Sequence, residues 1–283
     1  MGEIRRAQEA GRKYLEIGGD LPVRYELPDD PQEFPIECLL CDLDGTLIKS
    51  EAFWIELIER TVRETLGRPF SLEESDLPFV SGYTTLQHLQ YCLDKYAPQC
   101  SLIEANERYH RIAERELKEI EEGRGNLSAF CPREGAGDFL REVKRRGVRI
   151  GLATSGLRYK CVPEILALCR REKLGDPLKF FDAIITGGDR KGSGEYGTLG
   201  ELCAKPHPFL YRELAQAGLK QRNLRRAIGL EDSAAGVVSL RLAGVQALGF
   251  SDGNIRAAGF EDLCLKMISD FDSALLYIDS EKK

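Results

Sequence analysis

The 283-residue sequence has no long apolar run, and this absence limits the classes of protein to which it can belong. The longest uninterrupted apolar stretches, Ile165–Cys169 and Ala274–Ile278, contain five residues each, whereas a membrane-spanning helix needs about 20. The first 20 residues contain no apolar stretch of signal-peptide length. A membrane-embedded or secreted protein is therefore not expected, and we predict a cytoplasmic one.

Histidine is also scarce, and the chain has no net positive charge. The three histidines, His88, His110 and His207, lie on separate segments, which argues against a zinc site built mainly from imidazoles. Lys and Arg together number 40 and Asp and Glu 46, so the formal net charge is -6. Because non-specific nucleic-acid binding needs a cationic surface, we expect neither nucleic acid nor membrane as a partner.

Cysteine is more plentiful, but its pattern does not indicate a disulfide scaffold. The nine cysteines are odd in number and scattered, in a chain whose 42% hydrophobic residues can form a sizeable core. Cys38 and Cys41 form a CxxC pair inside an apolar run, and no second CxxC exists. We therefore expect reduced thiols that pack as small apolar side chains, without zinc or redox chemistry.

Residues 1–36 differ from the rest of the chain. A polar helical pattern from Glu3 to Ile17 is followed by two glycines and then by four prolines between Pro22 and Pro35. Prolines disfavour both helix interiors and central strands. We predict that residues 1–36 are an N-terminal extension, with a helix followed by an arm that lies over the surface.

Beyond this extension, short apolar runs alternate with amphipathic helical patterns. Such alternation is typical of an α/β fold with a doubly wound, mostly parallel, Rossmann-like sheet. The strand candidates are residues 38–44, 148–155, 180–187, 225–232 and 246–250, and the helical patterns lie near 134–147, 158–173, 206–219 and 233–243.

More than 100 residues separate the first two strand candidates, too many for one crossover helix. Trp54, Leu57, Val62 and Leu66 recur at three-to-four spacing, and residues 86–96 and 104–122 also have helical patterns. We therefore predict an inserted all-helical domain at residues 51–130. The core domain then comprises residues 37–50 and 131–283.

Four polar segments follow strand candidates, at the edge where open parallel sheets bind ligands. The first is Asp42-Leu43-Asp44-Gly45-Thr46. Period-two alternation puts Asp42 and Asp44 on one side of the chain, and Gly45 permits a sharp turn that exposes backbone amides. Two buried carboxylates this close repel each other, so the pair predicts a bound cation or a shared proton.

Each of the other three segments has an ordinary structural explanation when taken alone. The hydroxyl pair Thr154-Ser155 could cap a helix, and Lys205, which precedes Pro206, could be a loop lysine, although a lysine there can also neutralise a phosphate. The acidic pair Glu231-Asp232 could stabilise a helix N-terminus. All four segments in this order are far more specific than any one of them.

Together the segments resemble the haloacid dehalogenase (HAD) superfamily, whose motifs are a DxD signature, a Thr or Ser, a Lys and an acidic pair. DLDGT, KP and GLEDSAAG are similar to the subfamily of β-phosphoglucomutases, phosphoglycolate phosphatases and small sugar-phosphate phosphatases. That subfamily carries a helical cap after its first motif, as expected here at 51–130. The resemblance covers residues 38–283.

The resemblance implies a Mg²⁺-dependent phosphomonoesterase that hydrolyses a small soluble organic phosphate, such as a sugar phosphate, through an aspartyl-phosphate. Asp42 would be the nucleophile and Asp44 the general acid and base. Mg²⁺ would be held by the Asp42 carboxylate, the Asp44 backbone carbonyl and Asp232. Glu231 would lie beside these ligands and support them.

The resemblance also implies which residues contact the substrate. The phosphoryl oxygens would be bound by Thr154, Ser155 and Lys205. In the helical insertion, related proteins carry a substrate-specificity loop, and the candidates for leaving-group contacts here are Gly82, Tyr83 and His88. The glycine-rich stretch 187–205 is longer than expected and predicts a loop near the active site, not a dinucleotide fingerprint.

Other functions remain open at this point. A phosphosugar mutase is one alternative, although mutases of the family place an arginine in the specificity loop and residues 79–86 contain none. Phosphonate cleavage would require a lysine in the insertion that forms a Schiff base, and neither Lys49 nor Lys95 has a recognisable context. A catalytically inactive phosphate sensor or scaffold is a third alternative. The sequence leaves the oligomeric state open, with a monomer as the default expectation.

Overall fold

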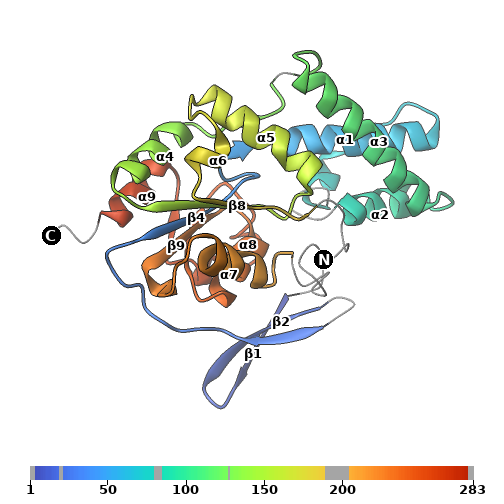
Figure 1. Ribbon diagram of the computed structural model, residues 1–283. Helices are drawn as coiled ribbons and strands as arrows, with labels where there is room; N and C mark the ends of the chain where they lie inside the picture. The colour runs from blue at the N-terminus through green and yellow to red at the C-terminus, as the bar shows by residue number, and fades with distance from the viewer. Residues whose placement is uncertain (1–3, 19–21, 80–84, 127, 189–203, 280–283) are drawn as a thin grey trace. The chain divides into compact units, whose positions relative to one another are not determined.

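The computed structural model of the protein describes residues 4–18, 22–79, 85–126, 128–188 and 204–279 (Figure 1). The chain divides into two compact units. One, the helical unit, is Lys49–Cys131; the other, the α/β unit, comprises Gly2–Ile48 and Pro132–Lys283. Across the described ranges, no helix combines the length and the apolar character needed to span a bilayer.

A six-stranded parallel sheet forms the centre of the α/β unit. Its strand order is β11 (Lys266–Ile268), β10 (Gln246–Phe250), β9 (Ala227–Glu231), β4 (Cys38–Asp42), β7 (Arg149–Ala153) and β8 (Ala183–Ile185). All five residues of β4 are buried, because strands of a parallel sheet are covered on both faces and read as continuous apolar runs. Each predicted strand is present, and the edge strand β11 is one that the sequence did not predict.

Helices cover both faces of this sheet, which confirms the predicted doubly wound α/β fold (Figure 1). One face carries α4 (Ala136–Arg145), α5 (Arg158–Arg171), α6 (Pro177–Phe180) and α9 (Phe271–Ile278), and the other carries α7 (Phe209–Glu213) and α8 (Ala234–Leu242). The helix predicted near 206–219 is shorter than expected, because α7 continues as a π-helical turn, η3 (Leu214–Gly218). The described residues of the unit also form the 3₁₀ turns η4 (Leu224–Arg226) and η5 (Glu261–Leu263).

The helical unit consists of α1 (Glu51–Leu66), η1 (Glu74–Phe79), α2 (Thr85–Tyr96) and α3 (Leu102–Glu121). The residues that α1 buries include Leu57 and Val62, as the three-to-four spacing predicted. Gly67 ends α1 with a positive φ of 63° and donates its N–H to the carbonyl of Arg63. The short strands β5 (Ile48–Lys49) and β6 (Cys131–Pro132) stand at the two boundaries of the unit.

The prediction of a helix from Glu3 to Ile17 is wrong. The segment forms the antiparallel strands β1 (Ile4–Glu9) and β2 (Arg12–Ile17). Together with β3 (Val23–Glu26) they make an antiparallel sheet, here called the N-terminal sheet. Glu9 pairs with Arg12 across a two-residue turn, in which Ala10 and Gly11 both have positive φ, 49° and 80°. This backbone twist suits a tight hairpin, but alanine there is unusual and concealed the turn in the sequence.

The N-terminal sheet contributes to the core of the α/β unit and does not only lie over its surface as an arm. Leu15 and Ile17 alternate on β2 and are each 2% exposed. They belong to one apolar core cluster with Leu210 and Tyr211 of α7 and Val237 of α8. The alternation places both side chains on one face of the strand, and the core of the α/β unit covers that face.

Candidate active site

The first, second and fourth motifs lie at the carboxyl ends of three adjacent parallel strands. Asp42 ends β4 and pairs in register with Ala153, directly before Thr154. On the other side of β4, Cys41 pairs with Leu230, directly before Glu231. Because neighbouring parallel strands end at the same edge, segments that are far apart in the chain meet there.

Three acids converge at this edge. Asp42, Glu231 and Asp232 each offer an oxygen atom, and these atoms lie within 4.8 Å of one another. Burial, followed by the charge of Glu231, raises the pKa of Asp42 well above its ordinary value. The same two causes raise the pKa of Asp232 to about 7. Such a cluster is costly unless a cation or a proton compensates its charge.

Lys205 supplies one positive charge to the cluster. Its Nζ donates to Asp42 Oδ1 and, at 2.6 Å, to Glu231 Oε1. Burial by itself would lower the pKa of Lys205, but the charges of Asp42 and Glu231 outweigh it and raise that pKa, so the ammonium stays protonated. One lysine does not balance the carboxylates of Asp42, Glu231 and Asp232. The set of oxygen donors and the excess negative charge fit Mg²⁺.

Glu231 is held tightly from several directions. Its Oε1 accepts hydrogen bonds from Lys205 Nζ and from the hydroxyl of Tyr211. Its Oε2 accepts from the backbone N–H and the Oγ of Ser233, at 3.3 and 3.1 Å. A Cβ at Gly236 would lie 1.8 Å from Glu231 Oε1. The Glu231 carboxylate thus occupies space that any side chain at position 236 would fill, and it fixes the ammonium of Lys205.

The remaining predicted residues of the core lie around this cluster. Thr154 Oγ1 donates to Asp44 Oδ2 at 3.4 Å and accepts from the backbone N–H of Gly156 at 2.9 Å. Ser155 Oγ accepts from the backbone N–H of Lys205 at 3.2 Å. The structure therefore links the second motif to the first through Asp44 and to the third through Lys205.

Sequence reasoning assigned no role to several residues that support the site. Thr46 Oγ1 donates to Asp232 Oδ1 at 3.0 Å, and its place in the DLDGT segment is a usable signal. Arg133 donates to the Thr46 carbonyl at 3.1 Å and to both carboxylate oxygens of Asp252. Its guanidinium also lies over the ring of Phe250. No local pattern indicates Arg133 or Tyr211, because their partners are distant in the chain.

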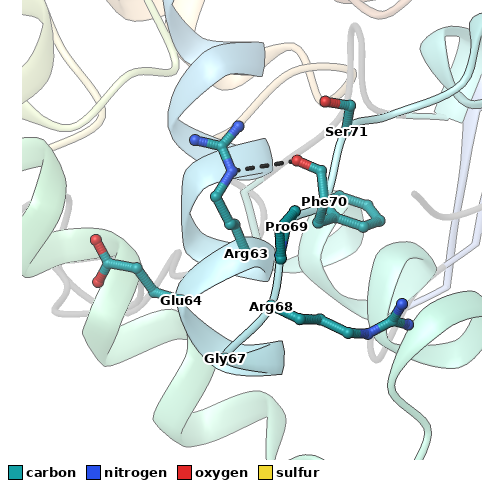
Figure 2. Close-up of a pocket in the computed structure, with 7 residues that line it drawn as sticks. All are labelled: Arg63, Glu64, Gly67, Arg68, Pro69, Phe70 and Ser71. Carbon is teal, nitrogen blue, oxygen red and sulfur yellow. Dashed lines mark hydrogen bonds between the residues drawn. The ribbon is translucent and has the colours of Figure 1, made fainter.

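The candidates in the helical unit are less well defined. Gly82 and Tyr83 lie outside the described residues, as does most of the stretch 187–205. His88 is half-buried on α2. Figure 2 shows a pocket beside the end of α1, where Arg63 Nε donates to the carbonyl of Phe70 at 3.2 Å. None of the residues that line this pocket is a predicted site residue.

The fold and the acid–lysine cluster define a class, that of α/β enzymes whose site lies at the carboxyl edge of a parallel sheet. A family model described as a haloacid dehalogenase-like hydrolase matches residues 36–244. The chain therefore belongs to the haloacid dehalogenase-like hydrolases. The prediction of that superfamily is confirmed, as is the prediction of an enzyme of its phosphatase type. The N-terminal sheet precedes the matched region.

Individual proteins are also similar to this chain in sequence or in fold. Protein CbbY from Cereibacter sphaeroides is 27% identical over 223 residues, which are 75% of this chain and 83% of that protein. The crystal structure of CbbY from Rhodobacter sphaeroides in complex with phosphate has a TM-score of 0.61 and 25% identity, over 83% of this chain and 95% of that one. A mutant of that CbbY in complex with xylulose-(1,5)-bisphosphate has a TM-score of 0.61 and 24% identity, with the same coverage.

Proposed function

We propose that this protein is a Mg²⁺-dependent phosphomonoesterase that hydrolyses a small sugar phosphate through an aspartyl-phosphate on Asp42. The observation that carries the proposal is the position of Asp42, a buried carboxylate at the end of the central strand, next to Lys205 and two further acids. The phosphate bound in the related CbbY structure supports a phosphorylated substrate. A cytoplasmic monomer remains our expectation for its location and assembly.

The reaction follows from the two carboxylates of the first motif. A carboxylate oxygen of Asp42 attacks phosphorus, and the bond between phosphorus and the ester oxygen breaks. The carboxyl group of Asp44 gives its proton to the departing alkoxide. Asp44 then takes a proton from water as that water attacks phosphorus, which releases inorganic phosphate and restores the Asp42 carboxylate. Asp44 is again protonated and ready for the next turnover.

The other residues bind and orient the phosphoryl group. Lys205 neutralises a phosphoryl oxygen while it also holds Asp42. In the substrate complex Thr154 would turn its hydroxyl proton from Asp44 to a phosphoryl oxygen, and the Ser155 hydroxyl would donate to the same group. A divalent ion would be held by the carboxylates of Asp42 and Asp232 and by the Asp44 backbone carbonyl, and when bound it lets the anionic nucleophile approach the anionic phosphate.

The direct test replaces the nucleophile. We expect Asp42→Asn to lower kcat for phosphate-ester hydrolysis at least about 1,000-fold, because an amide oxygen does not form the intermediate. Asp138→Asn, at a side chain that is 89% exposed, is the matched control and keeps the parent rate. Chelation of Mg²⁺ abolishes the activity of the parent, and added Mg²⁺ restores it. An Asp42→Asn variant that turns over at the parent rate contradicts the proposal.

The substrate is identified by a panel of phosphorylated metabolites. Release of inorganic phosphate, with the dephosphorylated sugar as co-product, is the expected result. An isomerised sugar phosphate without phosphate release would instead favour the mutase. A parent protein that binds phosphate esters in Mg²⁺ but turns none of them over would favour the inactive sensor.

A further inference from the structure

The N-terminal sheet shares an apolar core with α7, the helix that follows Lys205. Leu15 and Ile17 of β2 share an apolar cluster with Leu210 and Tyr211 of α7. Helix α7 begins at Phe209, shortly after the lysine motif. The sheet precedes the region that matches the family model, so whatever it contributes to the site is particular to chains that carry such an extension.

One polar contact joins the sheet to the lysine motif itself. The Tyr25 hydroxyl on β3 lies 2.9 Å from Nδ1 of His207, and the two rings meet edge to face with centroids 5.8 Å apart. His207 is 3% exposed, and its backbone carbonyl accepts from Ser239 Oγ of α8 at 2.6 Å. His207 is therefore held from the N-terminal sheet on one side and from α8 on another.

His207 is two residues from Lys205, with only Pro206 between them, whose ring restricts the backbone. On the side of Lys205 away from Pro206, the backbone N–H of Lys205 donates to Ser155 Oγ, which holds the backbone there. The ammonium of Lys205 has to meet both Asp42 and Glu231. A small displacement of the backbone at His207 would move the ammonium away from both, and misplacements of about 1 Å can cost two orders of magnitude in rate.

We infer that Tyr25 is a positioning residue, which acts through His207 to hold Lys205 against Asp42. On this basis the N-terminal sheet contributes to the active site by holding Lys205 in position. The inference rests on the proposed function, because it assigns to Lys205 the binding of a phosphoryl oxygen. Tyr25 itself touches neither substrate nor nucleophile in this account.

The first test is Tyr25→Phe, which keeps the ring and removes only the hydroxyl. We expect kcat to fall about fivefold, the equivalent of one net hydrogen bond, with the midpoint of thermal unfolding close to that of the parent. Tyr14→Phe is the matched control. Tyr14 lies in the same sheet, but its ring packs under the guanidinium of Arg24, so this variant keeps the parent kcat.

A double-mutant cycle separates positioning from general loss of stability. In a Lys205→Ala background there is no ammonium to place, so Tyr25→Phe should cause no further loss. If Tyr25→Phe lowers kcat equally in the parent and in the Lys205→Ala chain, Tyr25 has a merely structural role and the inference is overturned. If the Lys205→Ala chain turns over too slowly, the same cycle is run on the calorimetric affinity for inorganic phosphate.

The two proposals fail in distinguishable ways. A parent protein without phosphate-ester hydrolysis contradicts the proposed function, whatever Tyr25 does. An active parent whose Tyr25→Phe variant has the parent kcat contradicts only the positioning role. The phosphate-affinity cycle also tests the coupling between Tyr25 and Lys205 without turnover.

Discussion

At the scale of single residues, Gly45 leaves open the space that the carboxylate of Asp232 occupies. Gly45 has a φ of 79°, and a Cβ there would lie 2.0 Å from Asp232 Oδ2. We predict that Gly45→Ala displaces Asp232 and lowers both Mg²⁺ affinity and kcat/KM at least about tenfold. Titration calorimetry and a phosphatase assay measure the two effects.

The control for that variant is Gly147→Ala. Gly147 has a similar positive φ of 77°, but no atom lies within 4 Å of the position that its Cβ would take. Alanine at position 147 therefore has the same backbone strain as alanine at position 45, without the contact to an acid. Equal losses of Mg²⁺ affinity in both variants would mean that backbone strain, and not the displaced carboxylate, causes the effect.

The raised pKa of Asp232, about 7 against an ordinary 3.8, predicts a dependence on pH. Between these values the folded protein without metal binds a proton that the unfolded chain does not, so the contribution of Asp232 to stability falls as pH rises. Mg²⁺ replaces that proton. We therefore expect Mg²⁺ to raise the midpoint of thermal unfolding more at pH 8 than at pH 5.5. An equal shift at both values would contradict this.

At the scale of elements, one buried acid joins η1 to α2 in the helical unit. Asp76 is fully buried and accepts hydrogen bonds from the backbone N–H of Glu73 at 2.9 Å, from Tyr91 Oη and Lys95 Nζ at 2.7 Å each, and from Tyr96 Oη. Burial alone would raise the pKa of Asp76, but these donors outweigh it and lower that pKa. The carboxylate is thus the acceptor around which the end of α2 is organised.

We predict that Asp76→Asn lowers the free energy of unfolding by about 2 kcal/mol, because the amide puts a donor where the network needs an acceptor. Chemical denaturation measures the change. Asp94→Asn is the control, since Asp94 accepts only on the exposed surface of α2, from Gln90. If Asp76→Asn and Asp94→Asn have the same free energy of unfolding, the hydrogen bonds to Asp76 make no net contribution to stability.

At the scale of the whole α/β unit, the N-terminal sheet and the parallel sheet share one core. Leu15→Ala should therefore lower the free energy of unfolding by about 3 kcal/mol, as expected of a buried core leucine. Leu178→Ala, at a side chain that is 81% exposed, is the control and should change it by less than about 0.5 kcal/mol. A negligible cost for Leu15→Ala would mean that the extension detaches without consequence.

Much of this molecule can be read from local sequence. The continuous apolar run from Cys38 to Cys41 predicts a strand covered on both faces, and the three-to-four spacing from Trp54 to Leu66 predicts α1. Both signals depend only on near neighbours in the chain. The order of the four motifs, three of which stand at the ends of strands, likewise identifies the family and the candidate nucleophile Asp42.

Long-range packing decided the rest. The alternation of Leu15 and Ile17 is too short to outweigh the helical pattern around it, and both are buried because they join a core cluster to which α7 and α8 also contribute. Glu231 follows the same rule, since the pairing of β4 with β9 brings it beside Asp42. Lys205 and Tyr211, from the segment before α7 and from α7 itself, then donate hydrogen bonds to it. The sequence by itself determined which acids, hydroxyls and lysine are present; the tertiary structure decided which of them meet, because the sheet order and not the chain order makes them neighbours.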